Sequence, residues 1–325
     1  MGKNVLVTGG SGRLGNYVCP YLKEQGYNVS SFDVVPPRPD SANAKAGIPF
    51  VQGDLTSLGD CLRAFSFGQP DVIVHLGAIP FNVDLHPPYA GEYNRAVQDG
   101  LRFSQAMPEQ ATMEINTMGS FYVMDAARRL GIKKVIAASS YFVLGIGFRL
   151  SGTSYEPEYL PMDEEHPLLP EDSYSLSKVL GEEIYRAFVR AYDMRVVAMR
   201  LLGVYYPDFD RSRAMHTFNV QVPAATDQDK GYLVSNTYQY VDARDIAVFV
   251  KLSIEAGNLA PFEPFYVATD TKYTEPTSAI VARRWPFLAE KAKNIPGTEG
   301  IISIKKAERL LGYKPAYSWR TRELS

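Results

Sequence analysis

Short apolar runs alternate with longer amphipathic stretches through the first two hundred residues of the chain. The apolar runs predict strands over residues 5–7, 28–35, 48–52, 71–76, 133–139 and 195–200. Helical periodicity marks the stretches 17–25, 57–67, 114–130 and 171–192, the last with Asp172 or Ser173 as its cap. Strands that alternate with helices at this spacing predict an α/β fold with a doubly wound parallel sheet.

Two stretches interrupt this alternation, and a less regular part of the chain follows it. Residues 80–113 and 151–171 carry prolines and charges without sustained periodicity, which predicts loops, the first of them unusually long and with some helix. Beyond residue 200 we predict helices over 242–254, 274–285 and 303–311 and a strand over 265–268. The chain thus divides into a sheet domain over residues 1–200 and a smaller mixed region over 201–325, from which residues 240–268 return in part to the core.

Composition and charge exclude several classes of protein. The 325 residues are 46% hydrophobic and 22% charged, as in an ordinary globular protein, and the net charge of −2 gives no electrostatic case for nucleic acid or an anionic membrane. Neither a signal peptide nor a membrane-spanning run is expected, which favours the cytoplasm. The two cysteines, Cys19 and Cys61, fit neither a metal motif nor a disulfide framework, so no metal site is expected.

The first predicted strand runs directly into a glycine-rich turn. Gly9, Gly12 and Gly15 follow the strand and precede the first helix. Glycines in this context allow a tight turn, close approach of the backbone to a pyrophosphate, and close packing of helix on strand. The helix N-terminus adds unpaired N–H groups that attract phosphate. The segment therefore predicts a Rossmann-type dinucleotide site in the domain over residues 1–200.

The choice between NAD and NADP depends on the end of the second strand. Asp33 lies there, where a carboxylate can bind the adenosine ribose hydroxyls and repel a 2′-phosphate. Arg13 and Arg38 argue weakly for NADP, since either can meet a phosphate. We predict NAD.

A candidate reactive pair lies in the helix predicted over residues 171–192. Tyr174 and Lys178 are four residues apart and therefore share one helix face. A phenol has a pKa near 10, and a nearby ammonium together with a positively charged nicotinamide favours its phenolate form. The phenolate can then take a proton from a substrate hydroxyl while hydride leaves for the cofactor. Ser140, or else Ser139, ends the fifth strand where a second donor to the substrate oxygen belongs.

These residues bring the chain to a recognisable family. From about Lys3 to Trp319 it resembles an extended short-chain dehydrogenase/reductase of the NAD-dependent epimerase/dehydratase family. The segments that carry the resemblance are residues 8–15, Asp54-Leu55, 75–78, 116–119, Ser139-Ser140, Tyr174 with Lys178 and Glu182, and 240–242.

The resemblance implies a role for each candidate. Tyr174 would be the catalytic base, Lys178 its electrostatic partner and a ribose ligand, and Ser140 the substrate hydrogen-bond donor, with Asn116 supporting the site. His75 is expected to be a packed residue at a strand end. The implied cofactor contacts are Gly9, Gly12, Arg13, Leu14, Gly15, Asp33, Asp54, Leu55, Leu76, Gly77 and Ala78, together with Tyr174 and Lys178. The expected substrate contacts are Ser139, Ser140, Tyr141 and Gly203.

Departures from the family pattern narrow the choice among the reactions that family members catalyse. Members that dehydrate nucleotide sugars carry an Asp-Glu pair where this chain has Tyr141-Phe142, so dehydration is not expected. Members that hold a nucleotide diphosphate tend to have Asn where this chain has Gly203, and an Arg where residues 235–239 have none. Losing both would leave a diphosphate poorly neutralised. Arg95, Arg102, Arg211 and Arg213 remain candidates for binding a substrate carboxylate or phosphate.

The sequence thus predicts an NAD-dependent oxidoreductase that acts on a carbohydrate hydroxyl, with a lean toward a sugar or sugar-acid dehydrogenase similar to uronate dehydrogenases. An epimerase, for example a UDP-sugar 4-epimerase, would use the same residues and remains the alternative. A non-catalytic NAD-binding regulatory module is a further alternative, disfavoured because Tyr174 and Lys178 are both present. The family resemblance also implies a homodimer formed through the helices at residues 114–130 and 171–192.

Overall fold

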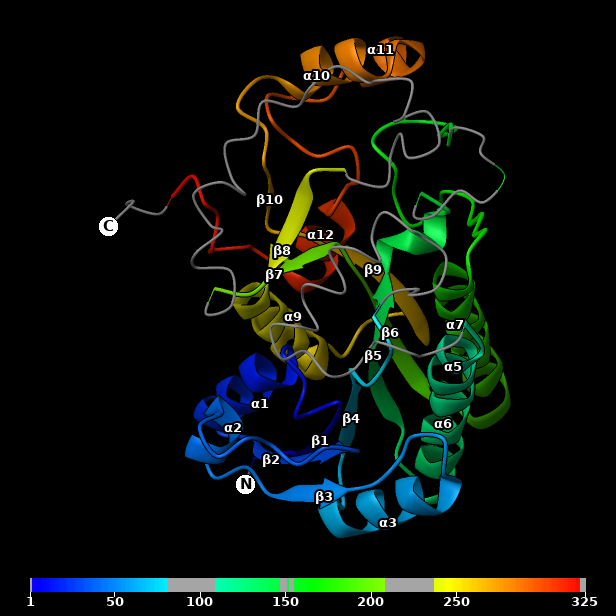
Figure 1. Cartoon of the computed structure of the whole chain (residues 1–325), viewed down its shortest axis with the longest axis vertical. Helices are drawn as coiled ribbons and strands as arrows, with labels where there is room; N and C mark the ends of the chain where they lie inside the picture. The colour runs from blue at the N-terminus through cyan, green and yellow to red at the C-terminus, as the bar shows by residue number, and fades with distance from the viewer. Residues whose placement is uncertain (1, 81–108, 147–150, 152–154, 208–236, 322–325) are drawn as a thin grey trace.

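The computed structural model describes residues 2–80, 109–146, 151, 155–207 and 237–321. Its main feature is a seven-stranded parallel sheet with helices on both faces (Figure 1). In spatial order the strands are β3 (Phe50–Gln52), β2 (Asn28–Asp33), β1 (Asn4–Thr8), β4 (Val72–His75), β5 (Lys134–Ser140), β6 (Arg195–Leu201) and β9 (Phe262–Val267). The predicted α/β fold with a doubly wound sheet is confirmed.

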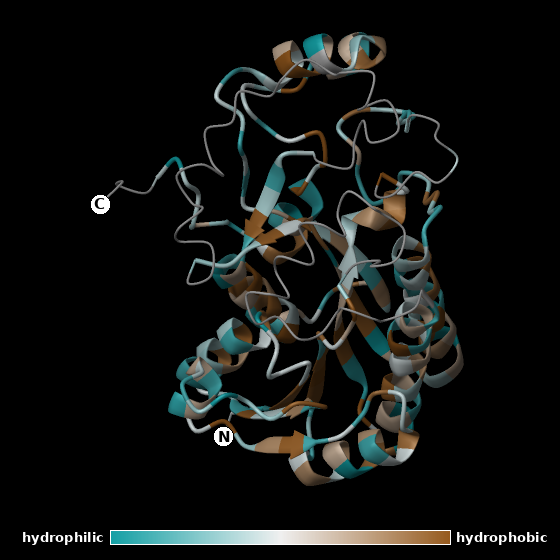
Figure 2. Ribbon diagram, viewed as in Figure 1, coloured by the Kyte–Doolittle hydropathy of each residue, from teal (hydrophilic) through white to brown (hydrophobic). Residues whose placement is uncertain are grey.

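The continuous apolar runs of the central strands follow from burial on both faces. Val5 and Val7 of β1 point into one core, and Leu6 between them points into the other. A strand buried on one face only would alternate apolar and polar residues. Figure 2 shows the hydrophobic residues gathered in the central strands.

Two groups of helices cover the sheet. One core lies beneath α1 (Gly15–Glu24), α9 (Ala243–Glu255) and α12 (Lys305–Leu311). The other lies beneath α3 (Leu58–Gly68), α6 (Gly119–Arg129) and α7 (Ser173–Tyr192).

The helix predicted over residues 114–130 is divided. It begins as α5 (Glu109–Met113), continues as a π-helical turn, η1 (Glu114–Met118), and ends as α6. A widened turn changes which side chains face the sheet without changing the apolar pattern, so periodicity alone does not reveal it. The long loop predicted over 80–113 falls mostly outside the described residues, and its last five positions form α5.

Two strands of the sheet begin or end at other residues than predicted. The predicted strand 28–35 ends at Asp33, the last residue that pairs with β3, and Val34 and Val35 are exposed. At the outer edge of the sheet β9 starts earlier than the predicted 265–268 and contains Pro264, which an edge strand tolerates.

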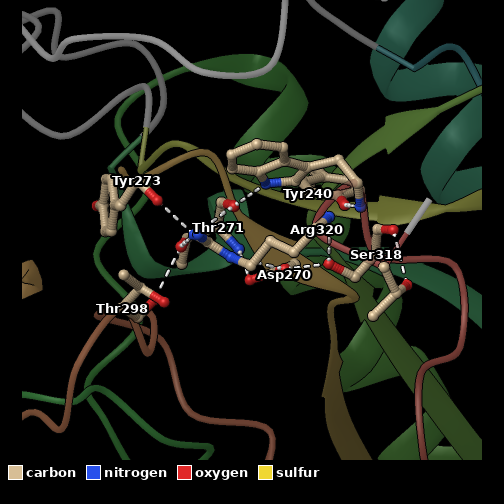
Figure 3. A network of polar contacts seen from close by, with 9 residues as sticks. Tyr240, Asp270, Thr271, Tyr273, Thr298, Ser318 and Arg320 are labelled. Carbon is tan, nitrogen blue, oxygen red and sulfur yellow. Dashed lines mark hydrogen bonds and ion pairs between the residues drawn. The ribbon is translucent and has the colours of Figure 1, made fainter. Parts of the chain in front are cut away.

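The C-terminal part builds a second, three-stranded sheet that the sequence did not predict. It consists of β7 (Gly203–Tyr205), parallel to β8 (Gln239–Asp242), and β10 (Asp270–Thr271), antiparallel to β8. Arg320 of the C-terminal segment forms an ion pair with Asp270 at 3.0 Å and hydrogen-bonds the Thr271 hydroxyl at 3.2 Å (Figure 3). A separate apolar core surrounds Trp285 among the remaining short elements. The short elements of the C-terminal part are α10 (Thr277–Arg284), η4 (Pro286–Leu288) and α11 (Ala289–Ala292). Two further short helices, α2 (Ala42–Lys45) and η2 (Tyr141–Leu144), lie earlier in the chain.

Candidate active site at the carboxyl edge of the sheet

The glycine turn connects β1 to α1 at the point where the strand order reverses, between β1 and β4. Gly9 has a φ of +68°, and a Cβ there would lie 2.6 Å from the Gly77 nitrogen in the loop after β4. A Cβ at Gly15 would overlap the Gly10 carbonyl oxygen. Only residues without a Cβ fit these two positions, which leaves the backbone and the α1 N-terminus accessible to a phosphate.

Two further groups make this turn suitable for a dinucleotide. Asp33 Oδ2 accepts a hydrogen bond from the Ser11 N–H at 3.0 Å, so its carboxylate lies against the turn. Burial raises the pKa of Asp33, against the effect of backbone hydrogen bonds from Val35 and Ser11. The Ser11 hydroxyl oxygen is buried with no hydrogen-bond partner in the described part of the chain. An unsatisfied donor here fits a phosphate oxygen.

The other predicted cofactor residues follow β3 and β4. Leu55 packs so closely against Gly77 that a Cβ added to Gly77 would lie 2.5 Å from the Leu55 Cδ1 atom. The Gly77 N–H donates to the Thr8 hydroxyl at 3.3 Å. Asp54 is exposed and accepts hydrogen bonds from the backbone and hydroxyl of Thr56. The remaining candidates are Gly12 and Arg13, exposed in the turn, and Leu14, Leu76 and Ala78, all half-buried.

Tyr174 and Ser140 meet at the carboxyl end of β5. Both are buried, and the Ser140 hydroxyl is close enough to the Tyr174 phenol to lower its pKa. Asp172 is the helix cap: its Oδ1 accepts from the Ser175 N–H at 2.9 Å and so fixes the first turn of α7, which carries Tyr174. Burial raises the pKa of Tyr174 to about 12, although the Ser140 hydrogen bond acts in the opposite direction. The protein alone therefore favours the neutral phenol.

Lys178 lies one turn further along α7. Its ammonium donates to the Ala138 carbonyl at 3.1 Å and lies 5.7 Å from the centre of the Tyr174 ring. Burial lowers the pKa of Lys178 to about 8, while the charge of Glu182 opposes that change. The lysine thus keeps its positive charge near neutral pH, next to the phenol.

Ser139 points away from this pair. Its hydroxyl donates to Glu182 Oε1 at 2.7 Å, because neighbouring residues of a strand face opposite sides of the sheet. The structure therefore gives no support to Ser139 as a substrate contact, and Ser140 alone of the two faces Tyr174.

Glu182 forms a buried ion pair that the sequence did not assign. Arg200 of β6 donates to both carboxylate oxygens at 2.9 and 2.8 Å, and each side chain is only 1% exposed. Arg200 is also the register partner of Ser139 and donates to the Glu164 carbonyl at 3.2 Å. A single arginine within the apolar segment of β6 was the one available signal.

Asn116 lies in the π-helical turn and is buried. Its amide donates to the Ile79 carbonyl at 3.0 Å and to the Ser177 hydroxyl at 3.0 Å, and its oxygen accepts from the Ile79 N–H at 2.8 Å. Ser177 in turn donates to the Tyr174 carbonyl at 2.7 Å. Asn116 therefore connects the loop after β4 to the turn that carries Tyr174, with Ser177 as a link that the sequence did not indicate.

His75 is a buried residue at a strand end, as expected. Its ring nitrogens lie 2.7 Å from the Thr8 hydroxyl and 3.3 Å from the Ser120 hydroxyl. Burial and the nearby charge of Lys178 lower the pKa of His75 to about 3, so it stays neutral at physiological pH.

The predicted substrate contacts are less closely assembled. Tyr141 follows Ser140, and its ring packs at a tilt of 56° against that of Phe142, with 4.5 Å between ring centres. Phe142 meets the Tyr174 ring edge-on at 6.0 Å. Gly203 is exposed, and among the described atoms a Cβ there would reach the Gln239 carbonyl oxygen at 3.7 Å. The four candidate arginines at 95, 102, 211 and 213 lie outside the described residues. Among the residues described, no group of three potential metal ligands occurs and no helix is long and apolar enough to cross a membrane.

Comparison with known proteins identifies the family. The sequence profile of the NAD-dependent epimerase/dehydratase family matches residues 5–102 and 93–267. The chain belongs to this family. It is an NAD-dependent enzyme, a dehydrogenase or an epimerase, and the turn around Gly9, Ser11 and Asp33 fits the cofactor.

Individual relatives agree with this membership. A Methanocaldococcus jannaschii relative, provisionally named a UDP-glucose 4-epimerase, is 30% identical over 203 residues, which are 62% of this chain and 56% of that protein. The Lacticaseibacillus casei UDP-glucose 4-epimerase is 24% identical and matches 96% of this chain and 92% of its own length. The fold is similar to that of a short-chain dehydrogenase/reductase superfamily protein from Agrobacterium tumefaciens, solved with bound NAD, with a TM-score of 0.64, 20% identity and coverage of 97% and 93% of the two chains.

Proposed function

We propose that this chain is an NAD-dependent dehydrogenase that oxidises a hydroxyl group of a sugar or sugar acid. The observation that carries the proposal is the buried contact of Tyr174 with Ser140 beside the Lys178 ammonium, at the same edge of the sheet as the glycine turn.

The proposed chemistry divides between these three side chains. NAD, when bound, accepts the hydride, and its oxidised ring carries a positive charge. Tyr174 takes the proton of the substrate hydroxyl, and Ser140 donates to the oxygen as it becomes a carbonyl. Because burial holds the pKa of Tyr174 near 12, the phenolate requires the positive charge of Lys178, which persists up to about pH 8.

The surroundings of Ser140 favour oxidation over dehydration. Tyr141 and Phe142 supply aromatic rings, and neither is a carboxylate able to protonate a leaving hydroxyl. The absence of Arg from residues 235–239 supports a substrate without a nucleotide diphosphate, and the Gln239 side chain in this stretch is bonded to the Ile302 backbone.

The second candidate is a sugar epimerase, favoured by the names of the sequence relatives. Tyr174, Ser140 and Lys178 would act as in the dehydrogenase, and the hydride would return to the other face of the ketone. The two functions differ in whether the oxidised sugar leaves.

One assay separates the two. Purified protein is incubated with NAD and a panel of free sugars, uronic acids and UDP-sugars, and NADH absorbance and sugar composition are followed in the same samples. NADH in proportion to an oxidised sugar supports the dehydrogenase. Interconversion of sugars without net NADH contradicts it and establishes the epimerase.

We also propose that the protein is a homodimer and resides in the cytoplasm. The pairing surface would be formed by α6 and α7, which expose large apolar side chains, Phe121 at 38%, Leu176 at 40% and Tyr192 at 42%. Sedimentation of the wild type and of Phe121→Glu tests the interface: the variant should be monomeric, and a wild-type monomer would contradict the proposal.

A further inference from the structure

Tyr206 is a residue of the C-terminal part that contacts the glycine turn and the first helix. It follows β7 in the C-terminal part, yet its ring centre is 6.1 Å from that of Tyr17, in the first turn of α1. The guanidinium of Arg13, in the glycine turn, lies 6.0 Å from the same ring centre. Both distances are within the range of aromatic and cation–π attraction. One side chain thus joins the C-terminal part to the glycine turn.

Tyr206 also has an electrostatic effect on the reactive end of the site, where it contributes to raising the pKa of Tyr174. Asp33 would hold the ribose of a dinucleotide and the α1 N-terminus its pyrophosphate, beside the Arg13 and Tyr17 side chains that the Tyr206 ring contacts.

Contacts of the preceding residue, Tyr205, within the C-terminal part hold Tyr206 in position. The Tyr205 ring meets Tyr240 of β8 edge-on at 6.3 Å. The Tyr240 hydroxyl accepts from the Trp319 N–H at 2.9 Å, and the neighbouring Arg320 is anchored to Asp270 (Figure 3). The C-terminal segment therefore holds the end of β7, and with it Tyr206, against the small sheet.

We propose that Tyr206 retains the bound cofactor, its ring closing over the glycine turn so that NADH leaves only after the ring separates from Arg13 and Tyr17. This inference rests on the cofactor of the proposed function and on neither its substrate nor its reaction. It adds a residue of the C-terminal part to the dinucleotide site.

The test measures NADH dissociation from the full-length protein by stopped-flow fluorescence, with excess NAD as the competitor. Tyr206→Ala removes the ring contacts with Arg13 and Tyr17 and should release NADH about tenfold faster. Tyr206→Phe keeps the ring and should stay within about twofold of the wild type. Tyr17→Leu removes the aromatic contact with Tyr206 and should release NADH about threefold faster, which keeps the test informative if Tyr206→Ala does not fold.

Phe262 offers a matched control. It also has an arginine over its ring, Arg186 at 4.0 Å, but it begins β9 at the amino edge of the sheet, whereas the glycine turn lies at the carboxyl edge. Phe262→Ala should release NADH at the wild-type rate.

The outcomes are distinct. Wild-type release rates in both Tyr206→Ala and Tyr17→Leu overturn the inference, as does equally fast release from Tyr206→Phe and Tyr206→Ala. A wild-type protein that binds no NADH overturns the cofactor assignment itself, whereas a wild-type protein that binds NADH but oxidises no sugar removes only the proposed reaction.

Discussion

The glycine turn and the Tyr174 corner lie at the same edge of the sheet but are held in place by different interactions. Around Gly9 and Gly15 the constraint is steric, because backbone atoms fill the space that a Cβ would need. Around Tyr174 the constraint is a set of buried polar contacts, from Asn116 and Ser177 on one side to Glu182 and Arg200 on the other.

This difference determines how each region responds to substitution. A steric constraint tolerates no added atom, whatever its chemistry. A buried polar network instead tolerates changes that preserve its charge balance, and fails when one partner is removed. The predictions below separate these two behaviours.

Removing one partner of the buried ion pair should have the largest effect on stability. Arg200→Leu leaves Glu182 charged and uncompensated in the core, which should lower the free energy of unfolding by about 3–5 kcal/mol. Urea denaturation measures it. In the double variant with Glu182→Leu most of the loss should be recovered, and a double variant as unstable as the single would contradict the charge argument.

Removing the reactive hydroxyl should affect turnover alone. Tyr174→Phe should reduce kcat by about 10³-fold while NADH binding stays within about twofold of the wild type. The assay uses whichever sugar the substrate panel identifies. Tyr27→Phe, which changes a half-buried tyrosine just before β2 at the amino edge of the sheet, is the control and should keep full activity. Full activity in Tyr174→Phe would remove Tyr174 from the mechanism.

An added methyl group in the glycine turn should weaken cofactor binding, which the Tyr174 variant leaves unchanged. In Gly15→Ala the Cβ meets the Gly10 carbonyl, so the turn must shift, and the Kd for NADH should rise by about a hundredfold. Fluorescence titration measures it. Gly257→Ala is the control, since no atom of the described residues lies within 4 Å of the added Cβ. An unchanged Kd in Gly15→Ala would show that the turn can relax without cost.

The smallest predicted effect concerns pH. Burial lowers the pKa of Lys178 from 10.5 to about 8, so between these values the unfolded chain binds this proton more strongly than the folded protein. Its contribution therefore makes the wild type more stable as pH rises from 8 to 10.5. The free energy of unfolding of Lys178→Met should exceed that of the wild type by about 2 kcal/mol at pH 7, and the difference should shrink toward pH 10. A difference that is independent of pH would contradict the assignment.

The sequence alone determined the features that depend on neighbouring residues. The strand, glycine turn and first helix are contiguous, and Tyr174 and Lys178 share a face because four residues make about one helical turn. The alternation of apolar runs and helices was sufficient to predict the doubly wound sheet. A strand that is buried on both faces is a continuous apolar run, and such a run can be identified from the sequence without knowing which strands it pairs with.

Only the tertiary structure decided the contacts between distant segments. Whether Ser139 faces the substrate or Glu182 depends on the twofold alternation at the end of β5 and on Arg200, which lies in the next strand. The π-helical turn that aims Asn116 at Ser177, and the small sheet that carries Tyr206 to Arg13, join residues separated by long stretches of chain. Such contacts arise from packing, since many partners of similar polarity are available along the chain and only the fold selects among them.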